Sequence, residues 1–175
     1  MKKKIAIFTT TLVLMTTTTF AQMTFKEYKA GHIFYVSLPD YMSKTTGLNS
    51  ASTIQFKSTL KDVYGFIIED NKEELQLLEI KYANLNDFYE DFIKDFVKDE
   101  KKRKVSKAES KKVGEINFME CDVSYYDTES KVEIYYFVGL VETPTYYYKV
   151  LCWGTLENKD KFKADFQKIL YSLKD

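Results

Sequence analysis

The chain has 175 residues, of which 26 are basic, 26 are acidic and 16% are aromatic. A formal net charge of zero argues against a dedicated nucleic-acid binder, which needs a positive excess to displace the counterions of phosphate. The rich supply of aromatic residues, with only six glycines and two prolines, excludes extensive disorder and predicts a packed core.

Residues 1–21, MKKKIAIFTTTLVLMTTTTFA, have the form of a secretory signal peptide, in which three lysines precede an apolar stretch. We expect cleavage after Ala21. A membrane span is disfavoured because residues 5–21 are short for a bilayer and include seven threonines. The sequence therefore predicts a periplasmic or secreted protein without stable membrane insertion, in which residues 22–175 form a single α+β domain. Loss of the three lysines changes its net charge to −3.

Three segments in the first half of this domain have strand character. The first, residues 32–38, ends before Pro39, because proline cannot donate a hydrogen bond to a sheet. Residues 52–59 and 63–69 are joined by a tight connection and are expected to form a hairpin.

The strongest single pattern begins after Asn84, where apolar residues recur on one helical face. This stripe consists of Leu85, Phe88, Tyr89, Phe92, Ile93, Phe96 and Val97. Asn84 is placed to cap the helix, and Asp87 puts a negative charge in its first turn. A second amphipathic helix is predicted over residues 158–173.

Residues 101–112 carry seven positive side chains and one acid, and two interpretations are open. Lys102, Arg103 and Lys104 form a candidate contact for anionic lipid headgroups or an acidic partner. Alternatively, the segment is an edge strand whose lysines prevent association between sheets, which is the simpler interpretation.

Residues 118–127, 132–141 and 145–155 are longer strand candidates with short connections, which predicts an antiparallel meander. A two-residue turn at Glu129 and Ser130 joins the first two strands. A turn through residues 142–144 would place Tyr146, Tyr148 and Cys152 on one apolar core face with residues 134, 136, 138 and 140. The predicted fold class is α+β, with an antiparallel sheet of about six strands sandwiched between helices.

The other face of this meander is mixed and carries a set of aromatic residues. These are Tyr126, Tyr135, Phe137, Tyr147 and Trp153. They are a candidate surface for a partner or an apolar ligand, because aromatic rings give large contact areas at little entropic cost. The alternative is that the second helix simply covers them.

The order of these elements resembles a known family. A strand ending in FYVSLPDYM, a hairpin, an acidic amphipathic helix, a meander and the close YYYKVLCWGTLENKDKFKADFQKILYSLK are similar to the PsbP-like fold family. That family includes the photosystem subunit PsbP and the Ran-binding Mog proteins. The resemblance implies an antiparallel sheet between helices and a binding module without catalytic residues.

Few residues carry chemistry. His32 is the only histidine and has no recognisable catalytic partners, so we expect no catalytic site. In the predicted register Cys121 and Cys152 lie two strands and about four residues apart, which exceeds the ~7 Å that a disulfide spans. We expect two buried free thiols, no metal site and no cofactor.

The sequence leads to two hypotheses of function. The first is an exported, non-enzymatic binding or assembly-assisting module that holds an unidentified envelope protein through the mixed face of the sheet. The second is a carrier of an apolar small molecule or lipid between sheet and helix, which would need an open aromatic pocket.

Overall fold

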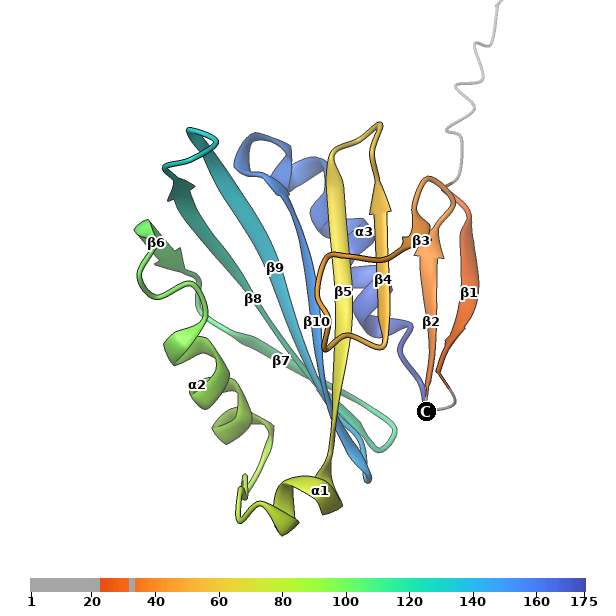
Figure 1. Ribbon diagram of the computed structural model, residues 1–175. Coiled ribbons are helices and arrows are strands. Elements are labelled where there is room, and N and C mark those ends of the chain that lie inside the picture. Colours follow the sequence, from red (N-terminus) through yellow and green to blue (C-terminus); the bar gives the residue numbers. More distant parts are fainter. Residues whose placement is uncertain (1–22, 32–33) are drawn as a thin grey trace, which may run out of the picture.

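The computed structural model describes residues 23–31 and 34–175, whose arrangement is shown in Figure 1. The predicted signal peptide and His32 lie outside the described residues. In chain order the elements are β1 (Phe25–Ala30), β2 (Phe34–Pro39), β3 (Ser43–Thr45), β4 (Ile54–Ser58), β5 (Val63–Asn71), α1 (Lys72–Leu77), α2 (Leu85–Asp95), β6 (Lys101–Val105), β7 (Glu109–Val113), β8 (Ile116–Asp127), β9 (Val132–Glu142), β10 (Tyr146–Thr155), a short 3₁₀ helix (Leu156–Asn158) and α3 (Lys159–Tyr171).

An eight-stranded antiparallel sheet forms the centre of the fold. Its strands lie in the order β3-β4-β5-β10-β9-β8-β6, and β7 pairs with a separate part of β8. Strands β1 and β2 form a hairpin of their own. The predicted fold class is confirmed, although the sheet has more than the six strands expected. The basic segment is an edge, as its simpler interpretation required, but it forms two strands, β6 and β7.

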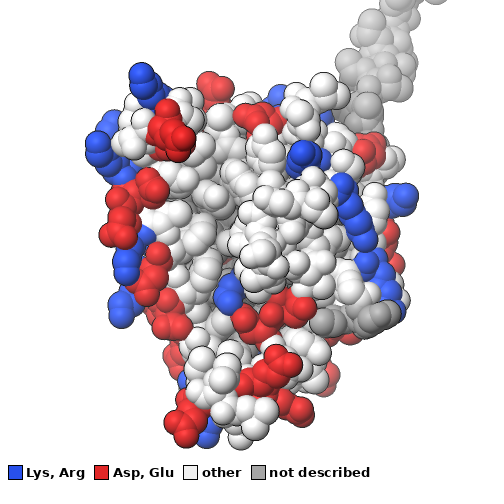
Figure 2. Space-filling model, in the orientation of Figure 1, with Lys and Arg blue, Asp and Glu red and all other residues white. Residues whose placement is uncertain are grey.

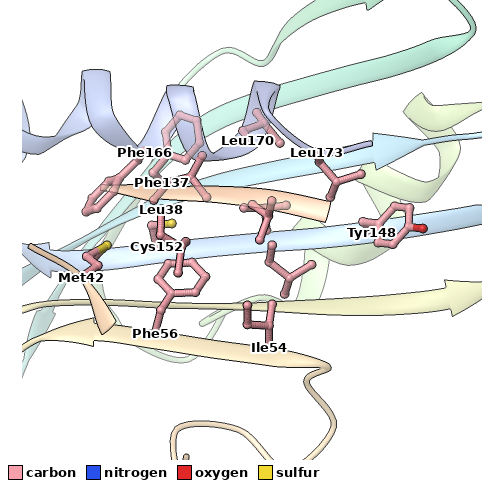
Figure 3. Packing of buried hydrophobic residues seen from close by; sticks show 14 of the residues in the cluster. Leu38, Met42, Ile54, Phe56, Phe137, Tyr148, Cys152, Phe166, Leu170 and Leu173 are labelled. Atoms are coloured by element: carbon pink, nitrogen blue, oxygen red, sulfur yellow. The ribbon is translucent and has the colours of Figure 1, made fainter. Parts of the chain in front are cut away.

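The two faces of the sheet are covered differently (Figure 1). Helix α3 and the β1–β2 hairpin pack on one side, here called the α3 face, and helix α2 packs on the other, here called the α2 face. Figure 3 shows Phe137 and Cys152 of the sheet packed with Leu38 of β2 and Phe166 of α3. Polar contacts also anchor α3, because Gln167 and Tyr171 donate hydrogen bonds to Glu120 at 2.6 and 2.8 Å.

Helix α2 begins as predicted. The Asn84 side chain accepts hydrogen bonds from the backbone N–H groups of Asn86 and Asp87 at 2.8 and 3.2 Å. The helix ends at Asp95, before the apolar stripe does, because Val97 has a φ of +46° and cannot continue a right-handed helix. Phe96 and Val97 therefore extend the stripe from a turn.

Of the two strand registers predicted for the meander, one is confirmed and the other is wrong. Tyr125 of β8 pairs with Ile134 of β9, as the expected two-residue turn requires. The predicted register between β9 and β10 is wrong by three residues, because β9 continues through Glu142 and Leu140 pairs with Lys149. A shift by an odd number of residues moves every side chain of β10 to the opposite face.

The observed register places the two cysteines on opposite faces of the sheet. Cys121 lies on the α2 face and Cys152 on the α3 face, and both are buried and free. The prediction of two free thiols is thus confirmed. The cysteines are two strands apart, as expected, and their side chains also lie on opposite faces of the sheet.

Candidate functional site

The α2 face is only partly covered. Phe88, Tyr89 and Ile93 of α2 are buried in a cluster with Cys121 and Val138 of β8 and β9. No described helix lies over the adjoining parts of β5 and β10 in Figure 1. Figure 2 shows this side with uncharged side chains across its middle and most charged side chains along its margins.

Four aromatic rings cross this surface on four neighbouring strands. The ring centroids of Tyr64 and Trp153 are 5.4 Å apart, those of Trp153 and Tyr136 are 5.4 Å apart, and those of Tyr136 and Tyr125 are 6.3 Å apart. Each pair is stacked, with interplanar angles of 18–23°. All four side chains are half-buried. We call them the aromatic row.

Neighbouring apolar side chains enlarge the row. Phe66 meets the edge of Trp153 at 5.6 Å, and Phe96, just beyond α2, meets the edge of Tyr136 at 5.1 Å. Ile68 of β5 is half-buried on the same face. The aromatic row together with Ile68 and with Phe66, which is itself buried at 8% exposure, is called the open face below.

A cleft runs between α2 and the sheet beside this surface. It encloses about 340 Å³ and is lined by Tyr82, Phe88, Asp91, Phe92, Asp95, Phe96 and Lys149. The Tyr82 hydroxyl donates to Asp91 Oδ2 at 2.7 Å, and burial, together with this hydrogen bond, raises the pKa of Tyr82 to about 12. Both aspartates are exposed, and Lys98 pairs with Asp95 at 2.7 Å, so the negative charge on this side of the cleft comes mainly from Asp91.

The corrected register divides the five aromatic residues of the predicted partner surface. Tyr135 and Phe137 are buried beneath α3, with exposures of 1% and 0%, so the helix covers them. Tyr126 is half-buried on the α3 face of β8, where Lys102 lies 5.2 Å above its ring. Trp153 alone belongs to the open face. Sequence reasoning missed its neighbours Tyr64 and Tyr136 because the pairing of β10 with β5 was not predicted and its pairing with β9 was predicted in the wrong register.

Tyr147 lies on the α2 face but is buried at the edge of the helix. Its ring stacks on that of Phe88 at 4.5 Å, and burial, followed by the nearby Glu142 carboxylate, raises its pKa to about 12. Lys72 forms an ion pair with Glu142 at 3.0 Å. Burial opposes ionisation of the Glu142 carboxyl, but its hydrogen bonds with Lys72 and Asn117 outweigh this effect and hold its pKa below the ordinary value. A second cleft, of about 300 Å³, lies here and is lined by Lys72, Leu75, Gln76, Ile80, Lys81, Tyr82 and Tyr147.

The three side chains of the predicted basic trio do not all lie on the surface. Arg103 points inward and donates from Nη2 to the carbonyl of Ile93 at 2.6 Å and from Nε to that of Phe96 at 3.0 Å. It thereby closes the C-terminal end of α2. Lys102 and Lys104 are exposed. An anionic contact by these two lysines stays a prediction.

Other reactive groups in residues 23–31 and 34–175 are held in the interior. Burial raises the pKa of the Cys121 thiol to about 11 and that of Cys152 further, so neither thiol is a thiolate at neutral pH. Over the same residues, no group of three His, Cys, Asp or Glu side chains is placed to hold a metal. None of the described helices has the length and apolarity to cross a membrane.

Comparison with solved structures supports the PsbP-like fold. The chain is similar to cyanobacterial PsbP (CyanoP) from Synechocystis sp. PCC 6803, with a TM-score of 0.59, 12% identity, and coverage of 89% of this chain and 95% of that one. It is also similar to LpqN, which is involved in cell envelope biogenesis of Mycobacterium tuberculosis, with a TM-score of 0.54, 8% identity, and coverage of 87% and 90%. No family model and no curated protein matches the sequence.

Proposed function

We propose that the protein is an exported, non-enzymatic module that binds a partner protein of the cell envelope through the open face. The observation that carries this proposal is the half-buried aromatic row on a part of the sheet that no described helix covers. Large, rigid rings of this kind contribute much of the binding energy at protein interfaces. The involvement of LpqN in cell envelope biogenesis and the predicted signal peptide support an exported site of action.

The buried thiols also fit a binding role better than a catalytic one. Neither cysteine is accessible as a nucleophile, and Asp122 is occupied in holding α3, since Lys159 and Lys163 both lie 2.8 Å from its Oδ2. The polar groups on the α3 face therefore stabilise the fold.

Native mass spectrometry of the mature chain, purified gently from its own cell envelope, tests the proposal. We expect a protein-sized added mass that is lost in Tyr64→Glu, because this charge would lie at the end of the aromatic row. Leu60→Glu is the matched control, since Leu60 is fully exposed in the turn before β5. Capture of the same partner by both variants, or a bare monomer in every preparation, would overturn the proposal.

A second candidate function is a carrier of an apolar small molecule. The space under α3, where this hypothesis first placed a ligand, is filled by Tyr135 and Phe137. The cleft beside α1 keeps the idea open, because its volume of about 300 Å³ lies at the lower end of small-molecule sites. An added mass on the order of a few hundred daltons, lost when Tyr82 is replaced by alanine, would support the carrier.

A further inference from the structure

The shape and charge of the open face indicate what kind of partner element it accepts. We propose that the occupant is an amphipathic helix of the partner protein, with basic residues along the edge that faces α2. This inference rests on the proposed function and specifies the element that would fill the same surface.

The spacing of the layers leaves room for one more helix. Neighbouring strands lie ~4.8 Å apart and packed helices lie ~8–10 Å apart, so a helix beside α2 would be centred about two strands away. Because α2 packs on β8 and β9, that position is over β10 and β5, where Trp153 and Phe66 lie. Leu48, in the loop between β3 and β4, packs on the same cluster and lies next to β4, on the side away from α2.

A helix suits this surface better than an extended peptide. Strands β5 and β10 are paired on both sides, β5 with β4 and β10, and β10 with β5 and β9. An extended peptide laid on this face would therefore find no free backbone groups to pair with. The N–H and C=O groups of the peptide itself would remain without hydrogen bonds to the sheet. A helix satisfies its backbone hydrogen bonds internally and can bury an apolar stripe on the rings.

The acidic side of the cleft defines the charge of the occupant. Asp91 and Asp95 lie one helical turn apart on α2 and line the cleft with Phe92 and Phe96. A basic residue of a neighbouring helix would match Asp91, and one a turn further along could share Asp95 with Lys98. Two lysines lie near this edge. Lys149 also lines the cleft but is paired with Asp70, whereas Lys98 pairs with Asp95 at 2.7 Å and offsets that carboxylate, so the negative charge open to a partner is mainly that of Asp91.

A second copy of the chain is a poorer occupant. The exposed apolar side chains of the α1 region, Leu77 and Leu78, are 83% and 69% exposed and would be the natural self-docking group. They are accompanied by acidic residues, namely Glu73, Glu74 and Glu79. These carboxylates would meet the aspartates of α2, and like charges across an interface oppose association.

Trp153 provides a direct test, because it is the only tryptophan in the chain. The probe is an 18-residue peptide of Leu, Lys and Ala, with leucines at i, i+3, i+4 and i+7 and lysines on the flanking positions. We expect a saturable blue shift of the Trp153 emission. Asp91→Asn should weaken binding by up to about fivefold, as expected for one exposed ion pair, and it leaves the Lys98–Asp95 pair in place.

Matched controls separate charge, helicity and fold. Glu115→Gln/Glu129→Gln removes two exposed carboxylates from the turns at the ends of β8 and should leave the affinity unchanged. A peptide with Glu in place of Lys, and a Lys peptide with two central prolines, should both fail to bind. Circular dichroism spectra of all variants should match.

The possible failures are distinguishable. Absence of a shift with the Lys peptide, or equal binding of the Glu or proline peptide, would overturn the helix inference. If the helix inference failed in this way but Tyr64→Glu still abolished capture of the native partner, the proposed function would stand and only the helix inference would be lost. Binding of the Lys peptide without any native partner would count against the proposed function alone.

Discussion

The role of Arg103 can be tested by one substitution with a matched control. Arg103→Gln removes the charged donors that bond the carbonyls of Ile93 and Phe96 at the end of α2. A hydrogen bond from a charged group contributes about 1.5–3 kcal/mol, but carbonyls at a helix end can rebond to water. We therefore expect a loss of about 2–3 kcal/mol, which lowers the Tm by roughly 4–12 °C in a domain of this size.

Lys104→Gln is the control, because it removes the same charge one residue away from an exposed side chain. Its free energy of unfolding should change by no more than about 0.5 kcal/mol. Thermal unfolding followed by circular dichroism gives both values, and amide hydrogen exchange over residues 92–96 should rise only in Arg103→Gln. Equal stability and equal exchange in the two variants would refute the inward role of Arg103 and revive the interpretation of the trio as a surface contact.

Two further predictions concern the interior. Burial opposes ionisation of Asp122, but hydrogen bonds from Lys159, Lys163 and Tyr135 lower its pKa below the ordinary 3.8. The ionised carboxylate therefore stabilises the fold above pH 3.8, and this stabilisation is lost as the pH falls through the pKa of Asp122 in the folded state. Urea unfolding between pH 7 and 3 should therefore show a smaller loss of stability in Asp122→Asn, and parallel curves would contradict this. A thiol reagent should modify neither Cys121 nor Cys152 in the native protein and both in denaturant without reductant, whereas fewer than two thiols there would reveal a disulfide.

Sequence reasoning succeeded where one local pattern determined the structure. Helix α2 has a single apolar side, and Asn84, directly before its first residue, has a side chain suited to N-capping. Both the helix and its start were therefore predictable. The β8–β9 pairing followed from a short turn, in which the Asp127 carboxylate accepts from the N–H groups of Glu129 and Ser130.

The β9–β10 pairing could not be predicted in the same way. Both faces of these central strands are apolar, since Tyr135 and Phe137 face α3 while Val138 and Leu140 face α2. A hydrophobic pattern selects a register only when one face is polar, so the turn near Pro144 left more than one solution. The aromatic row was missed for this reason, because its members meet only across strands. Helix α1 was missed because none of its residues is buried.

The end of the chain is built into the hairpin near its beginning. The backbone N–H of Tyr35 donates to the carbonyl of Lys174 at 2.8 Å, and the N–H of Lys174 donates back at 3.2 Å. The hydroxyl of Ser172 accepts from the N–H of Ser37, across 135 residues of sequence. Contacts of such long range form late in folding, because closing the intervening loop costs entropy. The α3 face is therefore completed only once the last turn of α3 is available, and loss of residues 172–174 would leave the β1–β2 hairpin without these three bonds.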